Sequence, residues 1–259
     1  MKAWNKDGKP SDHPEPWGQH GIFSTMRIFP GNKIPFRSDH LHRLSESGKQ
    51  LGLPWIPKTE TINELIEEFI SGMDAGHGLV RICIFEDIIG ISSRKARSDG
   101  NPVEGWLIRY RRLKPGIKLT VEKELYGSLS ELDVEKEDWI IIDPKENDLR
   151  ESATSNIIFV QDNKLMIPDK RVLNGIVQQK LLPILQDNFF VTRSTPQDQD
   201  VTSFDEIILC GTGRGVAPLA SLPELGWTSK QNDVFKIIRS HYEELIKSAC
   251  AYISFRLTI

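Results

Sequence analysis

The chain has 259 residues, of which 39% are hydrophobic and 27% are charged, with a net charge of −3. This length can bury one large core or two smaller ones, and the composition is ordinary for a globular protein. The small negative charge and the scattered basic residues do not favour nucleic acid or an anionic membrane as a partner. Because there is no long apolar run and no apolar leader segment, we expect a soluble, cytoplasmic protein.

The three cysteines, Cys83, Cys210 and Cys250, are odd in number and far apart in the chain. Cys83 and Cys210 lie inside apolar, strand-like runs. We therefore predict reduced, buried thiols and neither a disulfide framework nor a metal site.

The first half of the chain alternates short strand and helix patterns. Residues 1–18 are polar and rich in Pro and Gly, which predicts irregular structure. Helices are expected from Ser38 and from Thr61, where Glu64 completes a capping box, and Gly72 suits the end of the second helix. Strands are expected at residues 22–29, 80–85, 106–110 and 117–121, with a loop over residues 88–104.

The second half is expected to be richer in strands. A hairpin is predicted from residues 157–160 and 164–167, joined by a turn at 162–163. Further strands are expected at 139–142 and 206–210, and helices from Asn174 and over 233–249, with Pro183 kinking or ending the first of these helices. The apolar tail 252–259 has no assigned structure. The pattern indicates an α+β fold with a small domain at 1–115 and a larger, β-rich domain at 116–259.

Residues 149–160, with the sequence LRESATSNIIFV, place an acidic residue and an Asn directly before an apolar strand. A carboxylate beside a buried strand normally needs a partner, and a protonated heterocycle nitrogen would be one. The segment resembles the E-x-x-x-S-N-I-F signature of class IV aminotransferases, the fold-type IV enzymes that use pyridoxal phosphate (PLP). The resemblance implies that Glu151 pairs with the pyridine nitrogen of PLP and that Asn156 fixes the local backbone.

Two earlier segments resemble the same family. Residues 21–27, GIFSTMR, are similar to its G-x-F-E-T-M-R, with Ser24 in place of the usual Glu. Residues 40–44, HLHRL, are similar to its H-x-x-R-L helix. The resemblance implies that Arg43 binds the cofactor phosphate, which suits the planar and permanently charged guanidinium group.

Two later segments complete the set of five. Residues 173–177, LNGIV, are similar to the family's L-x-G-I-T, which implies that amides of Gly175, Ile176 and Val177 bind phosphate at a helix start. Residues 211–219, GTGRGVAPL, are similar to a turn in which Gly211 and Thr212 would bind phosphate or the substrate carboxylate. For Arg214 in this turn we expect a solvent-facing side chain.

The family also requires a lysine to which PLP is attached covalently. Lys118 stands at about the family's spacing before Glu151, and residues 115–118 fit the family context, whereas residues 119–124 alternate like a strand. Two alignments therefore stay open. In one, Lys118 is catalytic and an earlier strand is lost; in the other, residues 117–124 are that strand and the lysine-bearing helix is deleted. Lys114, Lys123, Lys136 and Lys145 fit only solvated charges.

The resemblance implies a two-domain, fold-type IV architecture with PLP between the domains, usually in a homodimer. One hypothesis is an enzyme acting on a small-molecule substrate, either an aminotransferase for a branched-chain or D-amino acid or an aminodeoxychorismate lyase. An alternative is an inactive homologue that binds PLP or another phosphorylated ligand noncovalently. A third is a structural homologue whose dimer is the functional unit.

Overall fold

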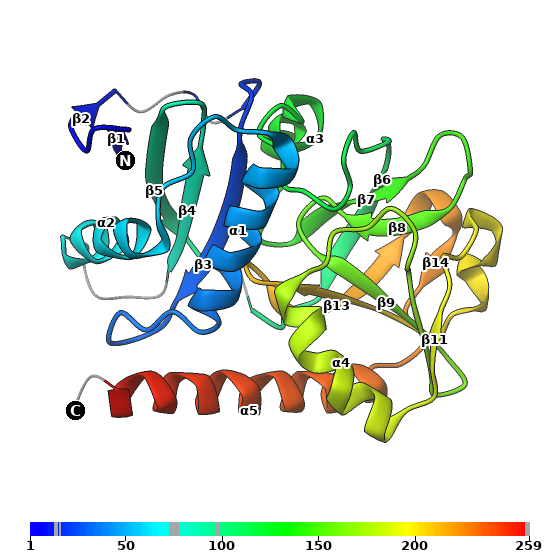
Figure 1. The fold of residues 1–259 in the computed structure, drawn as a ribbon. Helices are drawn as coiled ribbons and strands as arrows, with labels where there is room; N and C mark the ends of the chain where they lie inside the picture. The colour runs from blue at the N-terminus through cyan, green and yellow to red at the C-terminus, as the bar shows by residue number, and fades with distance from the viewer. Residues whose placement is uncertain (13–14, 16, 73–77, 97–98, 257–259) are drawn as a thin grey trace. The chain divides into compact units, whose positions relative to one another are not determined.

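The computed structural model describes residues 1–12, 15, 17–72, 78–96 and 99–256 (Figure 1). Its helices are α1 (Arg37–Leu51), α2 (Thr59–Ser71), α3 (Lys123–Gly127), α4 (Ile176–Asn188) and α5 (Asp233–Arg256), with short 3-10 turns at Ser128–Glu131, Asp198–Ser203 and Pro223–Leu225. Its strands are β1 (Lys2–Asn5), β2 (Pro10–Ser11), β3 (Ile22–Ile28), β4 (Gly78–Ile84), β5 (Ile88–Lys95), β6 (Val103–Arg109), β7 (Glu137–Ile142), β8 (Leu149–Ser152), β9 (Asn156–Gln161), β10 (Lys164–Ile167), β11 (Val191–Arg193), β12 (Glu206–Gly211), β13 (Gly215–Leu222) and β14 (Trp227–Thr228). The predicted α+β class is confirmed.

The chain forms two compact units. Unit 1 comprises Met1–Ala96, Ile117–Lys123 and Ser248–Ile259, and unit 2 comprises Arg97–Gly116 and Glu124–Lys247. The predicted single boundary between residues 115 and 116 differs from this division. The chain returns to unit 1 twice, because residues 117–123 pair with the start of β3 and the end of α5 leaves unit 2.

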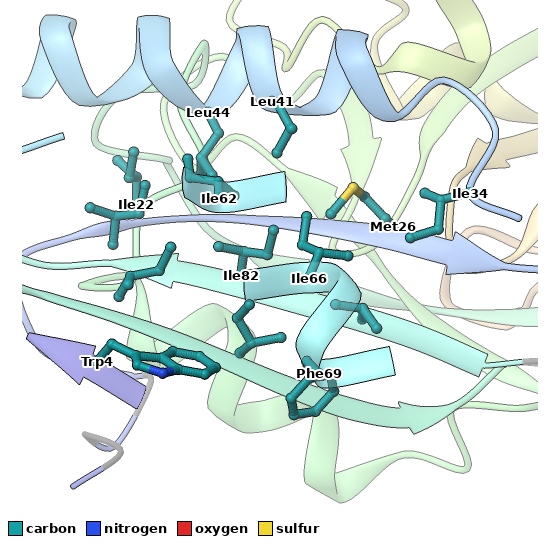
Figure 2. Packing of buried hydrophobic residues seen from close by; sticks show 14 of the residues in the cluster. Trp4, Ile22, Met26, Ile34, Leu41, Leu44, Ile62, Ile66, Phe69 and Ile82 are labelled. Carbon is teal, nitrogen blue, oxygen red and sulfur yellow. The ribbon is translucent and has the colours of Figure 1, made fainter. Parts of the chain in front are cut away.

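Unit 1 is built on a five-stranded antiparallel sheet in the order β2-β1-β5-β4-β3. Helices α1 and α2 bury one apolar face each, as their residue spacing predicts. Figure 2 shows the side chains of these helices packed with those of the sheet, including Leu41, Leu44, Ile62, Ile66, Ile22, Met26 and Ile82. This core fixes α1 against β3, the two elements that carry the first pair of family-like segments.

Three predictions for unit 1 were wrong. Residues 2–5 form β1 and residues 88–95 form β5, because both segments find backbone partners in this sheet that local sequence does not reveal. The helices begin earlier than predicted, at Arg37 and Thr59, and neither Ser38 nor Thr61 is the capping residue. Gly72 does follow the last residue of α2, as predicted.

The predicted strand at 117–121 is also wrong. This segment makes a single bridge, between Leu119 and Ile22, and its backbone hydrogen bonds join Lys118 to Phe23 in β3 and Thr120 to Gly21 just before β3. The short helix α3 then begins at Lys123. Residues 117–124 therefore do not form the strand that the second alignment requires.

Unit 2 is built on a nine-stranded mixed sheet in the order β11-β10-β9-β12-β13-β6-β7-β8, with β14 beside β13. Because β8 also pairs with β9, six of these strands close into a ring: β9, β12, β13, β6, β7 and β8. The predicted hairpin is confirmed as β9 and β10, and Asp162 and Asn163 both have the positive φ that a tight hairpin turn needs. Helices α4 and α5 share a hydrophobic cluster with β9, β10, β12 and β13.

Both long helices of unit 2 extend beyond the predictions. Helix α4 runs through Pro183 to Asn188, so the proline does not end it. Helix α5 continues through residues 250–256, which covers part of the tail left unassigned; residues 257–259 lie outside the described residues. The start of α5 is capped by the buried Glu206, whose carboxylate accepts the N–H groups of Val234 and Phe235. None of the helices in the described residues combines the length and the apolar character that crossing a bilayer requires.

Candidate active site

In unit 1, polar side chains from β3 and α1 form a short hydrogen-bonded chain. Ser24 Oγ lies 3.1 Å from His40 Nδ1, and Arg43 Nη2 donates to the same hydroxyl oxygen at 3.2 Å. The hydroxyl group has one proton and two lone pairs, so besides accepting from Arg43 it can either donate to Nδ1 or accept from it, according to the tautomer of His40. Ser24, which replaces the family's Glu, thus connects the predicted phosphate-binding arginine to a buried histidine.

Lys118 lies near this chain of side chains. Burial holds the pKa of His40 well below its usual value, and the positive charges of Arg43 and Lys118 lower it further. His40 is therefore neutral at neutral pH. Both cations lie within electrostatic reach of one buried ring, so unit 1 brings Arg43 and Lys118 together.

The environment of Lys118 differs from that of the neighbouring lysines. Its carbonyl oxygen accepts the N–H of Phe23 at 3.0 Å, and its Nζ lies 5.1 Å from the centroid of the Phe23 ring. A Cβ at Gly21 would lie 2.6 Å from the carbonyl oxygen of Ile84 and 3.1 Å from Thr120 Oγ1, so glycine is needed here chiefly because the end of β4 lies so close, with Thr120 near as well. Lys118 is half-buried, whereas the four lysines that fitted only solvated charges are exposed: Lys114, Lys123, Lys136 and Lys145.

In unit 2, Glu151 on β8 is buried and has two partners. Its Oε1 accepts a hydrogen bond from Arg112 Nη1 at 2.9 Å, and its Oε2 accepts the backbone N–H of Leu173 at 3.2 Å. The side chains of Arg112 and Glu151 are 5% and 6% exposed, so this is a buried ion pair. Such a pair satisfies the carboxylate that the sequence left without a protein partner.

Asn156 and Gly175 are in direct contact. Asn156 Nδ2 donates to the carbonyl oxygen of Leu173 at 2.7 Å, and a Cβ at Gly175 would lie 1.7 Å from Asn156 Oδ1. The close approach of Asn156 therefore requires glycine at position 175, independently of any ligand. Helix α4 begins just after it with Ile176 and Val177, and Gly175, as the N-cap residue, has no side chain with which to cap its first N–H groups.

The turn between β12 and β13 carries Gly211 and Thr212. A Cβ at Gly211 would lie 2.6 Å from Ser155 Oγ and 2.8 Å from the carbonyl oxygen of Thr154, so this turn packs closely on the loop after β8. The expectation of a solvent-facing Arg214 was wrong. Its side chain is buried and donates to the carbonyl oxygens of Val134, Glu135 and Glu137.

Two site residues, Asp138 and Arg112, were not found from the sequence. Asp138 accepts hydrogen bonds from Ser152 Oγ at 2.9 Å and from Thr154 Oγ1, and it lies 3.8 Å from Arg214. It thereby connects the loop after β8 to the turn that holds Thr212. The partners of these residues are distant in the chain, with 39 positions between Arg112 and Glu151, and no local motif marks such pairs.

Comparison with known proteins identifies the family. The model of the amino-transferase class IV family matches residues 21–222, so the chain belongs to this family. No curated protein sequence matches the chain significantly.

Solved structures with the same fold include a branched-chain aminotransferase from Thermoproteus uzoniensis with norvaline, at 17% identity and a TM-score of 0.78, covering 94% of this chain and 93% of that one. A branched-chain amino acid aminotransferase from Thermobaculum terrenum in its PLP form has 19% identity and a TM-score of 0.76, with coverages of 96% and 94%. A putative 4-amino-4-deoxychorismate lyase from Legionella pneumophila has 17% identity and a TM-score of 0.76, with coverages of 93% and 97%. These similarities confirm the predicted fold-type IV architecture.

Each unit, taken by itself, offers donor groups of kinds that suit PLP. Unit 1 offers a guanidinium group and a half-buried lysine, which suit a phosphate and a carbonyl carbon. Unit 2 offers an uncapped helix start, which suits phosphate oxygens, and a buried carboxylate, which suits a protonated ring nitrogen. Among the described residues there is no group of His, Cys, Asp and Glu that could hold a metal ion.

Proposed function

We propose that this protein is a PLP-dependent enzyme that uses Lys118 for covalent attachment of the cofactor and acts on the amino group of a small amino acid or an amino-chorismate. The observation that supports this most directly is the shared environment of Lys118 and Arg43 beside the buried His40. Residues 117–124 do not form a strand. This supports the alignment in which Lys118 is the catalytic lysine, since the alternative alignment requires a strand there.

The phosphate group would be bound by Arg43 and by backbone amides. Arg43 is held by its hydrogen bond to Ser24. The amides of Ile176 and Val177 lie at the start of α4, where the helix dipole favours an anion. Thr212 and Gly211 would add contacts from the turn between β12 and β13. Val177 replaces the family's Thr or Ser, so at this position only the amide is available.

The ring nitrogen would be bound by Glu151. PLP, when bound, supplies an electron sink for the pair of electrons left at the substrate's alpha carbon. Glu151 would keep the ring nitrogen protonated, and Asn156 would hold the backbone at Leu173 in place. Lys118 Nζ would carry the proton that leaves the alpha carbon, for which its half-buried position is suited.

We also propose that the protein is a cytoplasmic homodimer. The support is its membership of the amino-transferase class IV family. Its mass in solution, measured by sedimentation, tests the dimer.

The reaction can be tested with two sets of substrates. An aminotransferase would form the 2-oxo acid of a donor amino acid and consume a 2-oxo acid acceptor, whereas a lyase would release pyruvate from amino-chorismate with no acceptor present. We expect one of these products from the wild type and from K123A, which removes a neighbouring exposed lysine, but none from K118A. Product from K118A at the wild-type rate would refute the assignment of Lys118.

The noncovalent alternative predicts a different pattern. PLP would then stabilise the protein against heat without any product, and K118A would be stabilised to the same extent.

A further inference from the structure

Arg112 and Glu151 link two distant segments of unit 2. Arg112 lies between β6 and the segment that leads to Lys118, while Glu151 belongs to β8. The same Nη1 atom that donates to Glu151 also donates to the carbonyl oxygen of Pro115, at 3.1 Å. The guanidinium group is therefore anchored on its own segment and holds the carboxylate from one side.

The other oxygen of Glu151 is held by the peptide of Leu173. This residue is fixed at both ends, because its N–H donates to Glu151 and its carbonyl oxygen accepts from Asn156. Leu173 lies two residues before Gly175, after which α4 begins. These hydrogen bonds set the separation between the Glu151 carboxylate and the start of α4.

The carboxylate retains the capacity to accept another donor. An ionised carboxyl group offers about four lone-pair sites, and Glu151 uses its two oxygens for one hydrogen bond each. A third N–H can thus be accepted without displacing Arg112 or Leu173. A rigid ligand that contacts both Glu151 and the start of α4 needs this separation to be correct within a fraction of an ångström, on the order of 0.5 Å.

We infer that Arg112 is a positioning residue for cofactor binding, which holds the Glu151 carboxylate in the orientation that meets the ring nitrogen of PLP. The inference rests on the proposed function. Arg112 acts through Glu151 and does not contact the cofactor. Its removal should therefore weaken only those interactions that involve the ring nitrogen.

An analogue without the ring nitrogen separates this role from a general structural one. The affinities of PLP and of 1-deaza-PLP, in which a carbon replaces that nitrogen, are measured by fluorescence titration for the wild type and for R112Q, E151Q and the double variant R112Q/E151Q. A hydrogen bond to a charged group is worth about tenfold to a hundredfold in affinity, so we expect the wild type to prefer PLP by this factor. R112Q should reduce the preference by about tenfold and leave the affinity for 1-deaza-PLP within about threefold of the wild-type value.

The double variant tests whether Arg112 acts through Glu151. In the E151Q background, R112Q should change the preference by less than about twofold, because the carboxylate that it positions is already gone. The exposed Arg109 offers a matched control, and R109Q should behave as the wild type. R112K keeps a cation beside Glu151 and should give a smaller loss of preference, so it replaces R112Q in the cycle if that variant does not fold.

The possible results are distinct. An unchanged preference in R112Q or R112K, together with a loss in E151Q, would refute the role of Arg112 while leaving the proposed function intact. Equal losses of affinity for both compounds would show that Arg112 is only structural. A wild type that binds neither compound would refute the proposed function, and the role of Arg112 with it.

Discussion

The contact between Gly175 and Asn156 gives the most specific structural prediction. A methyl group at position 175 would lie 1.7 Å from Asn156 Oδ1, a distance that two nonbonded atoms cannot reach. Asn156 is buried and is held by its hydrogen bond to Leu173, so it cannot move without losing that bond. G175A should therefore destabilise the fold through crowding.

The magnitude follows from two costs. Overpacking a well-packed site costs about 1–3 kcal/mol, and leaving a buried hydrogen-bonding group unsatisfied costs about 1–3 kcal/mol. We thus expect G175A to lower the free energy of unfolding by about 2–5 kcal/mol in urea titrations followed by circular dichroism. G116A is the matched control, since a Cβ at this exposed glycine meets no atom within 4 Å.

A second background tests the cause. In N156A the crowding atom is absent, so adding G175A should cost less than about 1 kcal/mol. If G175A costs the same with and without Asn156, or no more than G116A, the reasoning is refuted.

Three further predictions concern titratable groups. The pKa of His40 is lowered by burial, so below pH 6.5 the unfolded chain binds a proton that the folded chain does not. Between pH 6.5 and 5.5 the wild type should therefore lose more stability than H40Q, by up to about 1 kcal/mol, and equal losses would contradict this. Burial raises the pKa of Asp143, but hydrogen bonds from Arg111 and from backbone amides, with the charge of Arg150, outweigh burial and hold this pKa at about 2. The stability advantage of the wild type over D143N should therefore be full above pH 4 and disappear as the pH falls through 2. An advantage that persists below pH 2 would argue against this assignment. Burial raises the pKa values of Cys83 and Cys210 to about 12. A disulfide reagent should therefore modify Cys250 first in the folded protein and all three thiols only in urea, whereas rapid modification of Cys83 and Cys210 in the folded protein would show that they are accessible.

Local patterns predicted those parts of the fold in which the responsible residues are neighbours in the chain. The hairpin of β9 and β10 was predicted because its turn residues and its alternation lie within one short segment. The buried faces of α1 and α2 follow from residue spacing alone. By contrast, β1 forms because it pairs with β5, and β5 forms because it pairs with β1 and β4. Nothing in residues 2–5 marks the distant partner of β1.

The same limit applies to the candidate site. The five family-like segments gave Arg43, Glu151 and the start of α4, but no segment shows what a side chain will contact. Arg214 has the character of a surface residue, yet its guanidinium group is buried among carbonyl oxygens that lie 77–80 positions away in the chain. Lys118 was ambiguous because the alternation of residues 117–121 resembles a strand, whereas this segment makes only an isolated bridge at the start of β3.

The identity of the lysine is the central claim, and covalent trapping tests it most directly. Protein incubated with PLP is reduced with borohydride, which makes the bond between the cofactor and its lysine permanent, and the peptides are mapped by mass spectrometry. We expect a pyridoxyl adduct on Lys118 in the wild type and in K123A, and no adduct in K118A. An adduct on another lysine, or none at all in a protein that binds PLP, would contradict the proposal that Lys118 carries the cofactor.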